Sequence, residues 1–164
     1  MEQKSKEQSE EKELLKEYLN QYYIGRIRRT QLEERLKNIQ EEMTVPIGGY
    51  GYSPVNGSTN KVGSGAALFV YRMSEIETRI EEQKSQVEKS LLKVMDLMDF
   101  LEENSKERMI LELRFIDCKS WTVIEREMHL SRSSLFAYQD KGLFKLLMYK
   151  KVHQILDEYQ KSMK

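Results

Sequence analysis

Hydrophobic residues recur at helical spacing in two long stretches of this chain and in several shorter segments after them. The first long stretch runs from Ser9 to about Glu42, with one gap in its apolar stripe around Gly25 and Arg29. Residues 1–9 are polar and are expected to fray. Because an apolar stripe on a helix is stable only when it is covered, we expect this helix to pack against another helix. The stripe consists of Leu15, Tyr18, Tyr22, Leu32, Leu36, Ile39 and Met43.

Residues 66–103 predict a second long helix, whose apolar positions alternate steps of three and four. Two polar residues, Gln83 and Ser90, interrupt this coiled-coil seam, and such residues can set the register and the number of partners. The apolar stripe is wider than a two-stranded seam requires, which favours a homodimer over packing on the connector or the terminal helix of the same chain. The residues predicted to mediate oligomerisation are Ile76, Ile80, Val87, Leu91, Val94 and Met98.

Residues 44–65, TVPIGGYGYSPVNGSTNKVGSG, differ from both long stretches because they contain six glycines and both prolines of the chain. This composition is incompatible with a regular helix. A phosphate-binding P-loop would need a lysine and then a serine or threonine directly after its last glycine. Here Lys61 precedes Gly63 instead, and Val62 separates them. We interpret the segment as a long connector rather than a nucleotide site.

The stretch Asn104–Tyr149 predicts three short helices, broken at Asp117–Lys119 and at His129–Leu130. Ser120 and Ser131 follow the two breaks, and serine is a good residue for capping the N-terminus of a helix. Two helices joined by a turn of about three or four residues form a helix-turn-helix, whose second helix fits the major groove of DNA. The pattern therefore predicts DNA binding.

The predicted fold is all-α, with a long antiparallel helical hairpin (coiled-coil-like) followed by a small helix-turn-helix domain and a C-terminal helix. The hairpin and oligomerisation region covers residues 1–103, including the Gly-rich connector at 44–65. The DNA-binding domain and the C-terminal helix cover residues 104–164. Asn104 and Glu107 form a capping-box-like pair at the boundary, so we expect almost no linker between the two parts.

The helix that opens at Ser131 has two dissimilar sides. Leu135 and Tyr138 lie three positions apart and are expected to face the core. On the other side, Arg132 is the first choice for a base contact, because a guanidinium group can donate to both major-groove acceptors of guanine. The predicted DNA-binding residues are Lys119, Ser131, Arg132, Ser133, Phe136, Ala137 and Lys141. The alternative is that this face binds another protein.

Charge is distributed unevenly along a chain whose formal net charge is zero. Residues 1–104 hold 15 basic and 19 acidic side chains, giving −4, whereas residues 105–164 hold 12 basic and 8 acidic ones, giving +4. The basic surplus lies on the segment predicted to meet phosphate, but it is modest for a nucleic-acid-binding domain. We therefore expect binding to depend on two copies of the domain.

The sequence does not show the features of an enzyme, a secreted protein or a membrane protein. The two histidines, His129 and His153, lack partners at metal-ligand spacing, and we predict no catalytic residue, metal or cofactor. Cys118 is the sole cysteine, which excludes an internal disulfide and fits a cytoplasmic location. No apolar run approaches the ~18 residues of a membrane span, and the polar start is unlike a signal peptide.

The residues ERMILELRFIDCKSWTVIEREMHLSRSSLFAYQDKGLFKLL resemble the fourth-region helix-turn-helix of bacterial sigma factors. The glutamate-arginine start, the leucine-x-leucine-arginine run and the serines before the second and third helices correspond, whereas Ile124-Glu125 stands where an isoleucine-alanine pair is usual. Residues 50–148 as a whole resemble the ArpU/RinA-type phage regulators of packaging and lysis genes. The sigma-factor resemblance implies that Arg132, Ser133, Phe136 and Ala137 face the groove.

Taken together, these features predict a sequence-specific DNA-binding transcriptional regulator, a phage or prophage late-gene activator that acts with host RNA polymerase. Its expected partners are double-stranded DNA, a second copy of the chain and the polymerase, with no membrane. The alternative is a small DNA-packaging protein similar to a terminase small subunit, whose helical core would assemble into a ring.

Overall fold

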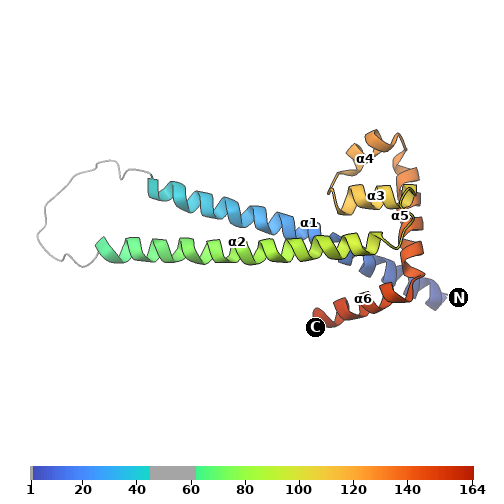
Figure 1. Ribbon diagram of the computed structural model, residues 1–164, viewed down its shortest axis with the longest axis horizontal. Coiled ribbons are helices and arrows are strands. Elements are labelled where there is room, and N and C mark those ends of the chain that lie inside the picture. Colours follow the sequence, from blue (N-terminus) through green and yellow to red (C-terminus); the bar gives the residue numbers. More distant parts are fainter. Residues whose placement is uncertain (1, 45–61) are drawn as a thin grey trace, which may run out of the picture. The chain divides into compact units, whose positions relative to one another are not determined.

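The computed structural model describes the backbone of residues 2–44 and 62–164, and the side chains of 3–42 and 67–164. The described residues form helices without any strand, which confirms the predicted all-α class (Figure 1). The helices are α1 (Glu2–Thr44), α2 (Val62–Met98), α3 (Lys106–Phe115), α4 (Trp121–Met128), α5 (Arg132–Leu147) and α6 (Lys150–Ser162). Most of the predicted connector at 44–65 lies outside the described residues.

The two long helices differ from the predictions at their ends. Helix α1 already begins at Glu2, before the predicted start at Ser9. Helix α2 spans Val62–Met98 instead of 66–103. A short link therefore separates α2 from α3, and Arg108 stabilises it by donating to the carbonyl oxygen of Leu101 at 3.2 Å and to Asp99 at 3.1 Å.

The contacts group the chain into two compact units. Unit 1 comprises Met1–Gly25 and Val87–Lys164, and unit 2 comprises Arg26–Gln86. Unit 1 contains residues from both sides of the predicted boundary at residue 104, because the first part of α1 and the end of α2 share a core with the short helices. The division into an oligomerisation region and a DNA-binding domain stays a prediction.

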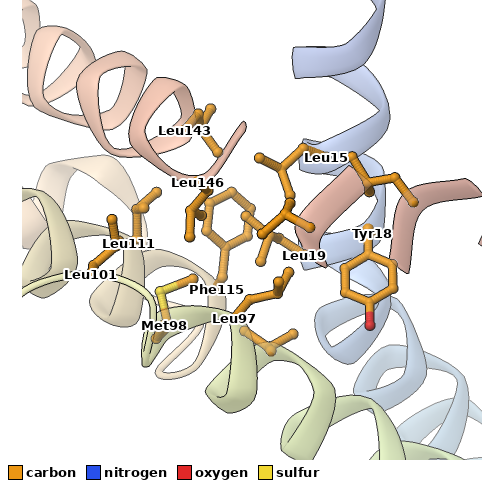
Figure 2. Packing of buried hydrophobic residues seen from close by; sticks show 13 residues of the cluster. Leu15, Tyr18, Leu19, Leu97, Met98, Leu101, Leu111, Phe115, Leu143 and Leu146 are labelled. Carbon is orange, nitrogen blue, oxygen red and sulfur yellow. The ribbon is translucent and has the colours of Figure 1, made fainter. Parts of the chain in front are cut away.

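The larger core of unit 1 collects side chains from five helices (Figure 2). Leu15 and Leu19 of α1 and Leu97 of α2 are fully buried there. The rings of Tyr18 and Tyr159 meet edge to face, with 5.3 Å between their centroids. Burial, with the nearby charges of Asp96 and Glu158, raises the pKa of Tyr18 to about 12. The buried members of this core are Leu15, Tyr18, Leu19, Val94, Leu97, Met98, Leu101, Leu111, Phe115, Leu143, Leu146, Val152 and Leu156.

A smaller core lies between α3, α4 and α5. Ile110, Ile124 and Leu135 are fully buried in it, one from each helix, and Tyr138 packs against them. The prediction that Leu135 and Tyr138 face inward is therefore confirmed. Because these helices are short, burying one apolar stripe of each in a shared core supplies most of their stability.

The predicted breaks between the short helices are confirmed, and the backbone shows their cause. Cys118 and His129 adopt left-handed conformations with φ of 55° and 54°. A residue in this conformation commonly ends a helix. The hydroxyl oxygens of Ser120 and Ser131 then accept hydrogen bonds from the amides of Val123 at 3.4 Å and Ser134 at 3.3 Å. Both serines are thus the N-caps that the sequence predicts.

The predicted capping box at Asn104 was wrong. Ser105 caps α3, because its hydroxyl oxygen accepts from the amide of Arg108 at 3.2 Å. The carboxylate of Glu107 points elsewhere and pairs with lysines of α5. Met148 and Tyr149 separate α5 from the C-terminal helix α6, which begins at Lys150.

Candidate nucleic-acid interface

Helix α5 separates its residues onto a sealed side and an open side. Its sealed side packs on the rest of unit 1 through Leu135, Gln139, Gly142, Leu143 and Leu146. The open side carries six of the predicted DNA-binding residues, all exposed: Ser131, Arg132, Ser133, Phe136, Ala137 and Lys141. We call these six residues the α5 face.

Gly142 holds α5 close to α3. A Cβ atom at this position would lie 2.8 Å from Cδ1 of Leu111 and 3.2 Å from Cβ of Glu107. Leu111 is fully buried and so has little room to move. A side chain at this position would therefore push α5 outward, and the α5 face would shift with it.

Arg132 at the start of α5 is bound to α4. Its Nη2 atom donates to Oγ1 of Thr122 at 3.1 Å and to Oε2 of Glu125 at 3.0 Å. The side chain of Arg132 is still 48% exposed, and that of Glu125 is 30% exposed. The guanidinium group is thus accessible, but one of its three nitrogens is already engaged within the protein.

Lys119 lies in the turn between α3 and α4 and not on α5. Its ammonium group is 2.8 Å from both carboxylate oxygens of Glu127 on α4. Its carbonyl oxygen accepts a hydrogen bond from Arg114 at 3.0 Å. The structure therefore ties Lys119 to α3 through its backbone and to α4 through its side chain.

Lys141 is paired with a buried carboxylate. Its Nζ atom is 3.0 Å from Oε1 of Glu107, and Nζ of Lys145 is 3.4 Å from the same oxygen. Burial alone would raise the pKa of Glu107, but its own backbone amide, Lys141 and Lys145 lower it below the ordinary value. The hydrogen bond and charge of Glu107 raise the pKa of Lys141. Each of Lys119, Arg132 and Lys141 therefore forms an ion pair with a glutamate of the same chain.

The aromatic residues beside the α5 face contact one another. The ring of Phe136 meets that of Trp121 edge to face, with 5.0 Å between their centroids. The guanidinium carbon of Arg114 lies 5.1 Å from the centre of the Trp121 ring. Phe136 remains 42% exposed. Trp121 therefore anchors one edge of the face, in line with its place in the smaller core.

The first part of α1 borders the α5 face, which the sequence did not predict. Nζ of Lys12 is 2.9 Å from Oδ1 of Asp140. A groove of about 390 Å³ is lined by α1 residues together with Trp121 and Phe136. A second groove, of about 670 Å³, is lined by other α1 residues with Lys141 and Phe144. Lys12 stands among many charged residues on α1, so no sequence signal distinguished it.

The predicted oligomerisation residues are covered to different degrees within a single chain. Val94 and Met98 belong to the larger core, and Val87 is 6% exposed. Ile76, Ile80 and Leu91 are half-buried. Intramolecular packing thus accounts for Val94 and Met98 without a second copy. The apolar residues of α2 that stay exposed in unit 1 are Leu92, at 60%, and Met95, at 46%.

Comparisons with protein-family models, with curated proteins and with solved structures find no match to this chain. Within 2–44 and 62–164, none of the helices combines the length and apolar character needed to cross a bilayer. Across the same described residues, His, Cys, Asp and Glu side chains form no group of three that could hold a metal ion.

Proposed function

We propose that this protein is a sequence-specific DNA-binding transcriptional regulator. In this proposal α4 and α5 form a helix-turn-helix, with residues 129–131 as its turn and α5 as the helix that enters the major groove. The observation that carries the proposal is the α5 face. Opposite a side sealed by the cores, a helix capped by Ser131 presents Arg132, Ser133 and Ala137 to solvent.

The N-terminus of α5 supports a phosphate contact. The hydroxyl of Ser131 lies 3.2 Å from that of Ser133 and 3.0 Å from that of Ser134, so three hydroxyl groups gather there. The amides of the first helical turn carry partial positive charge, which favours an anion such as a backbone phosphate. This end of the helix therefore suits contact with the DNA backbone, while Arg132 and Ala137 suit base edges.

We further propose that α1 and α2 pair as an antiparallel hairpin and that two copies of the chain place two α5 faces on one DNA site. Along each long helix the less exposed residues follow the predicted apolar stripe, from Leu15 to Ile39 on α1 and from Met73 to Leu97 on α2. By its resemblance to sigma-factor region four and to ArpU/RinA-type regulators, the protein would activate phage late genes together with host RNA polymerase.

Footprinting tests the DNA-binding proposal directly. The purified full-length chain would be incubated with the DNA that flanks its own gene, at low and at moderate salt. We expect a discrete protected segment near a promoter, lost when Ser133 and Ala137 are both replaced by glutamate. Glutamate substitutions at the exposed Gln154 and Gln160 on α6, which change the charge by the same two units, should leave the protection intact. Absence of protection at low salt, with the wild-type protein folded, would refute the proposal.

A further inference from the structure

One nitrogen of the Arg132 guanidinium group, Nη2, donates both of its hydrogens to residues of α4. Nη2 carries two N–H groups and makes two hydrogen bonds, to Thr122 and to Glu125. Nη1 and Nε of Arg132 donate no hydrogen bond to any of the residues that the structure describes. The contacts of Arg132 are therefore concentrated on a single atom.

Nη2 is the atom that a contact through two parallel N–H donors requires. A guanidinium group presents parallel N–H pairs either at its end, from Nη1 and Nη2, or along its side, from Nε and Nη2. Both pairs include Nη2. Reading guanine through its two major-groove acceptors uses such a pair. In the observed arrangement, Arg132 is left with single donors, which suit one phosphate oxygen or one base acceptor.

We propose that Glu125 is a specificity-determining residue that suppresses guanine recognition by Arg132. The inference rests on the proposed DNA-binding function and adds to it. Glu125 sits on α4, half-buried, and its carboxylate opposes release of Nη2 toward DNA. The same carboxylate lies beside the α5 face and would repel phosphate. Removing it frees Nη2 and allows the two-donor contact.

The size of the effect follows from two competing interactions. A partly exposed ion pair shifts an equilibrium by up to about fivefold. A good two-donor contact discriminates a base by about five- to 150-fold. The ion pair thus offsets a substantial part of guanine discrimination without preventing DNA binding. We expect Glu125→Ala to raise the preference for guanine at one position of each half-site by about fivefold.

Glu127 provides a matched control. It lies on the same helix, carries the same charge and also pairs with a predicted DNA-binding cation, Lys119. Glu127→Ala removes one negative charge as well, so it should raise affinity for all sequences alike. Only Glu125→Ala should change which base is preferred. Adding Arg132→Ala to Glu125→Ala should cancel the new preference, because the two-donor contact is then lost.

The experiment selects from a pool of short duplexes with a randomised central segment, using the full-length wild type and each variant. Circular dichroism confirms that each variant is folded. Stronger guanine enrichment with Glu125→Ala, absent from Glu127→Ala and from the double variant, supports the inference. Equal affinity gains without a new preference overturn it, as does weaker binding of Glu125→Ala, which would make Glu125 a support for Arg132. If no folded variant binds any duplex at low salt, the proposed function itself fails.

Discussion

The carboxylate of Glu107 and the ammonium group of Lys141 lie 3.0 Å apart and join the start of α3 to the middle of α5. The glutamate side chain is 6% exposed and the lysine side chain 60% exposed, so the pair links the interior of unit 1 to its surface. Gly142 follows Lys141 directly and lets the two helices approach. The position of the α5 face therefore depends on the buried charge of Glu107 and on the small size of Gly142.

This pair predicts a pH-dependent stability. The folded-state pKa of Glu107 is lowered, so its stabilising contribution is complete above its unfolded pKa and is lost as pH falls through the folded value. Glu107→Gln should lower the free energy of unfolding at neutral pH by about 1–3 kcal/mol. The difference between the two proteins should shrink as the solution is acidified below the ordinary carboxyl pKa. Urea unfolding of both proteins at a series of pH values measures this difference in the free energy of unfolding.

Glu103→Gln is the control for that experiment, since Glu103 is an exposed carboxylate in the link before α3. This variant should track the wild type at every pH. A difference between Glu107→Gln and wild type that stays constant down to strongly acidic pH would contradict the assignment.

Gly142→Ala tests the close approach of α3 and α5. Alanine normally stabilises a helix interior by about 1 kcal/mol relative to glycine. Here the added Cβ would meet Leu111 at 2.8 Å, and we expect a net loss of about 1–3 kcal/mol instead. The sign of the change in thermal unfolding decides the question, because a rise in stability would mean that the helices have room for a side chain.

Leu15→Ala tests whether α1 is part of the folded core of unit 1. Leu15 is fully buried against residues of the C-terminal helices, so the substitution should cost about 2–5 kcal/mol. Ile24→Ala on the same helix is the control, since Ile24 is 41% exposed. Ile24→Ala should change the free energy of unfolding by no more than about 0.5 kcal/mol. Similar losses for both variants, measured by chemical unfolding, would argue against the packing of α1 on this core.

Lys141→Ala tests whether the predicted DNA-binding residue Lys141 contacts the DNA backbone. A phosphate contact contributes alike to all sequences, so the variant should bind specific and random duplexes more weakly and should reduce the salt slope by about one unit. Lys145→Ala is the control, because Lys145 pairs with the same glutamate but is not on the α5 face. Equal changes for both lysines would assign the effect to Glu107 rather than to a DNA contact.

Oligomeric state distinguishes the proposed regulator from a packaging protein. We expect sedimentation equilibrium to show a homodimer, and a ring of eight or more copies would favour packaging instead. Leu92 and Met95 are exposed on α2, so a double substitution to lysine should convert the dimer to monomer with unchanged helical content. The change of exposed Ser85 and Gln86 to lysine adds the same two charges and should preserve the dimer. A dimer that survives both double substitutions would place the interface elsewhere.

Local sequence patterns determined that the described part of this chain is helical and that the short helices break before Ser120 and Ser131. The capping serines at 120 and 131 and the apolar spacing of Ile124, Leu135 and Tyr138 act over three or four residues. Such short-range preferences can be read without knowing the fold. For the same reason the open side of α5 was predictable, since it lies opposite the apolar side of the same helix.

The tertiary structure alone decided which partners those residues meet. Nothing local to Arg132 shows that Thr122 and Glu125 engage its Nη2 atom, and nothing local to Lys12 places it beside Asp140. Likewise, the stripe on α2 predicted that Val94 would be covered and favoured a second copy of the chain as its partner, whereas the core of unit 1 buries it. The periodicity of apolar residues specifies which side of a helix needs a partner. The packing of several helices that are distant in the sequence then selects that partner. The same packing pairs the charges of the α5 face with glutamates of the same chain.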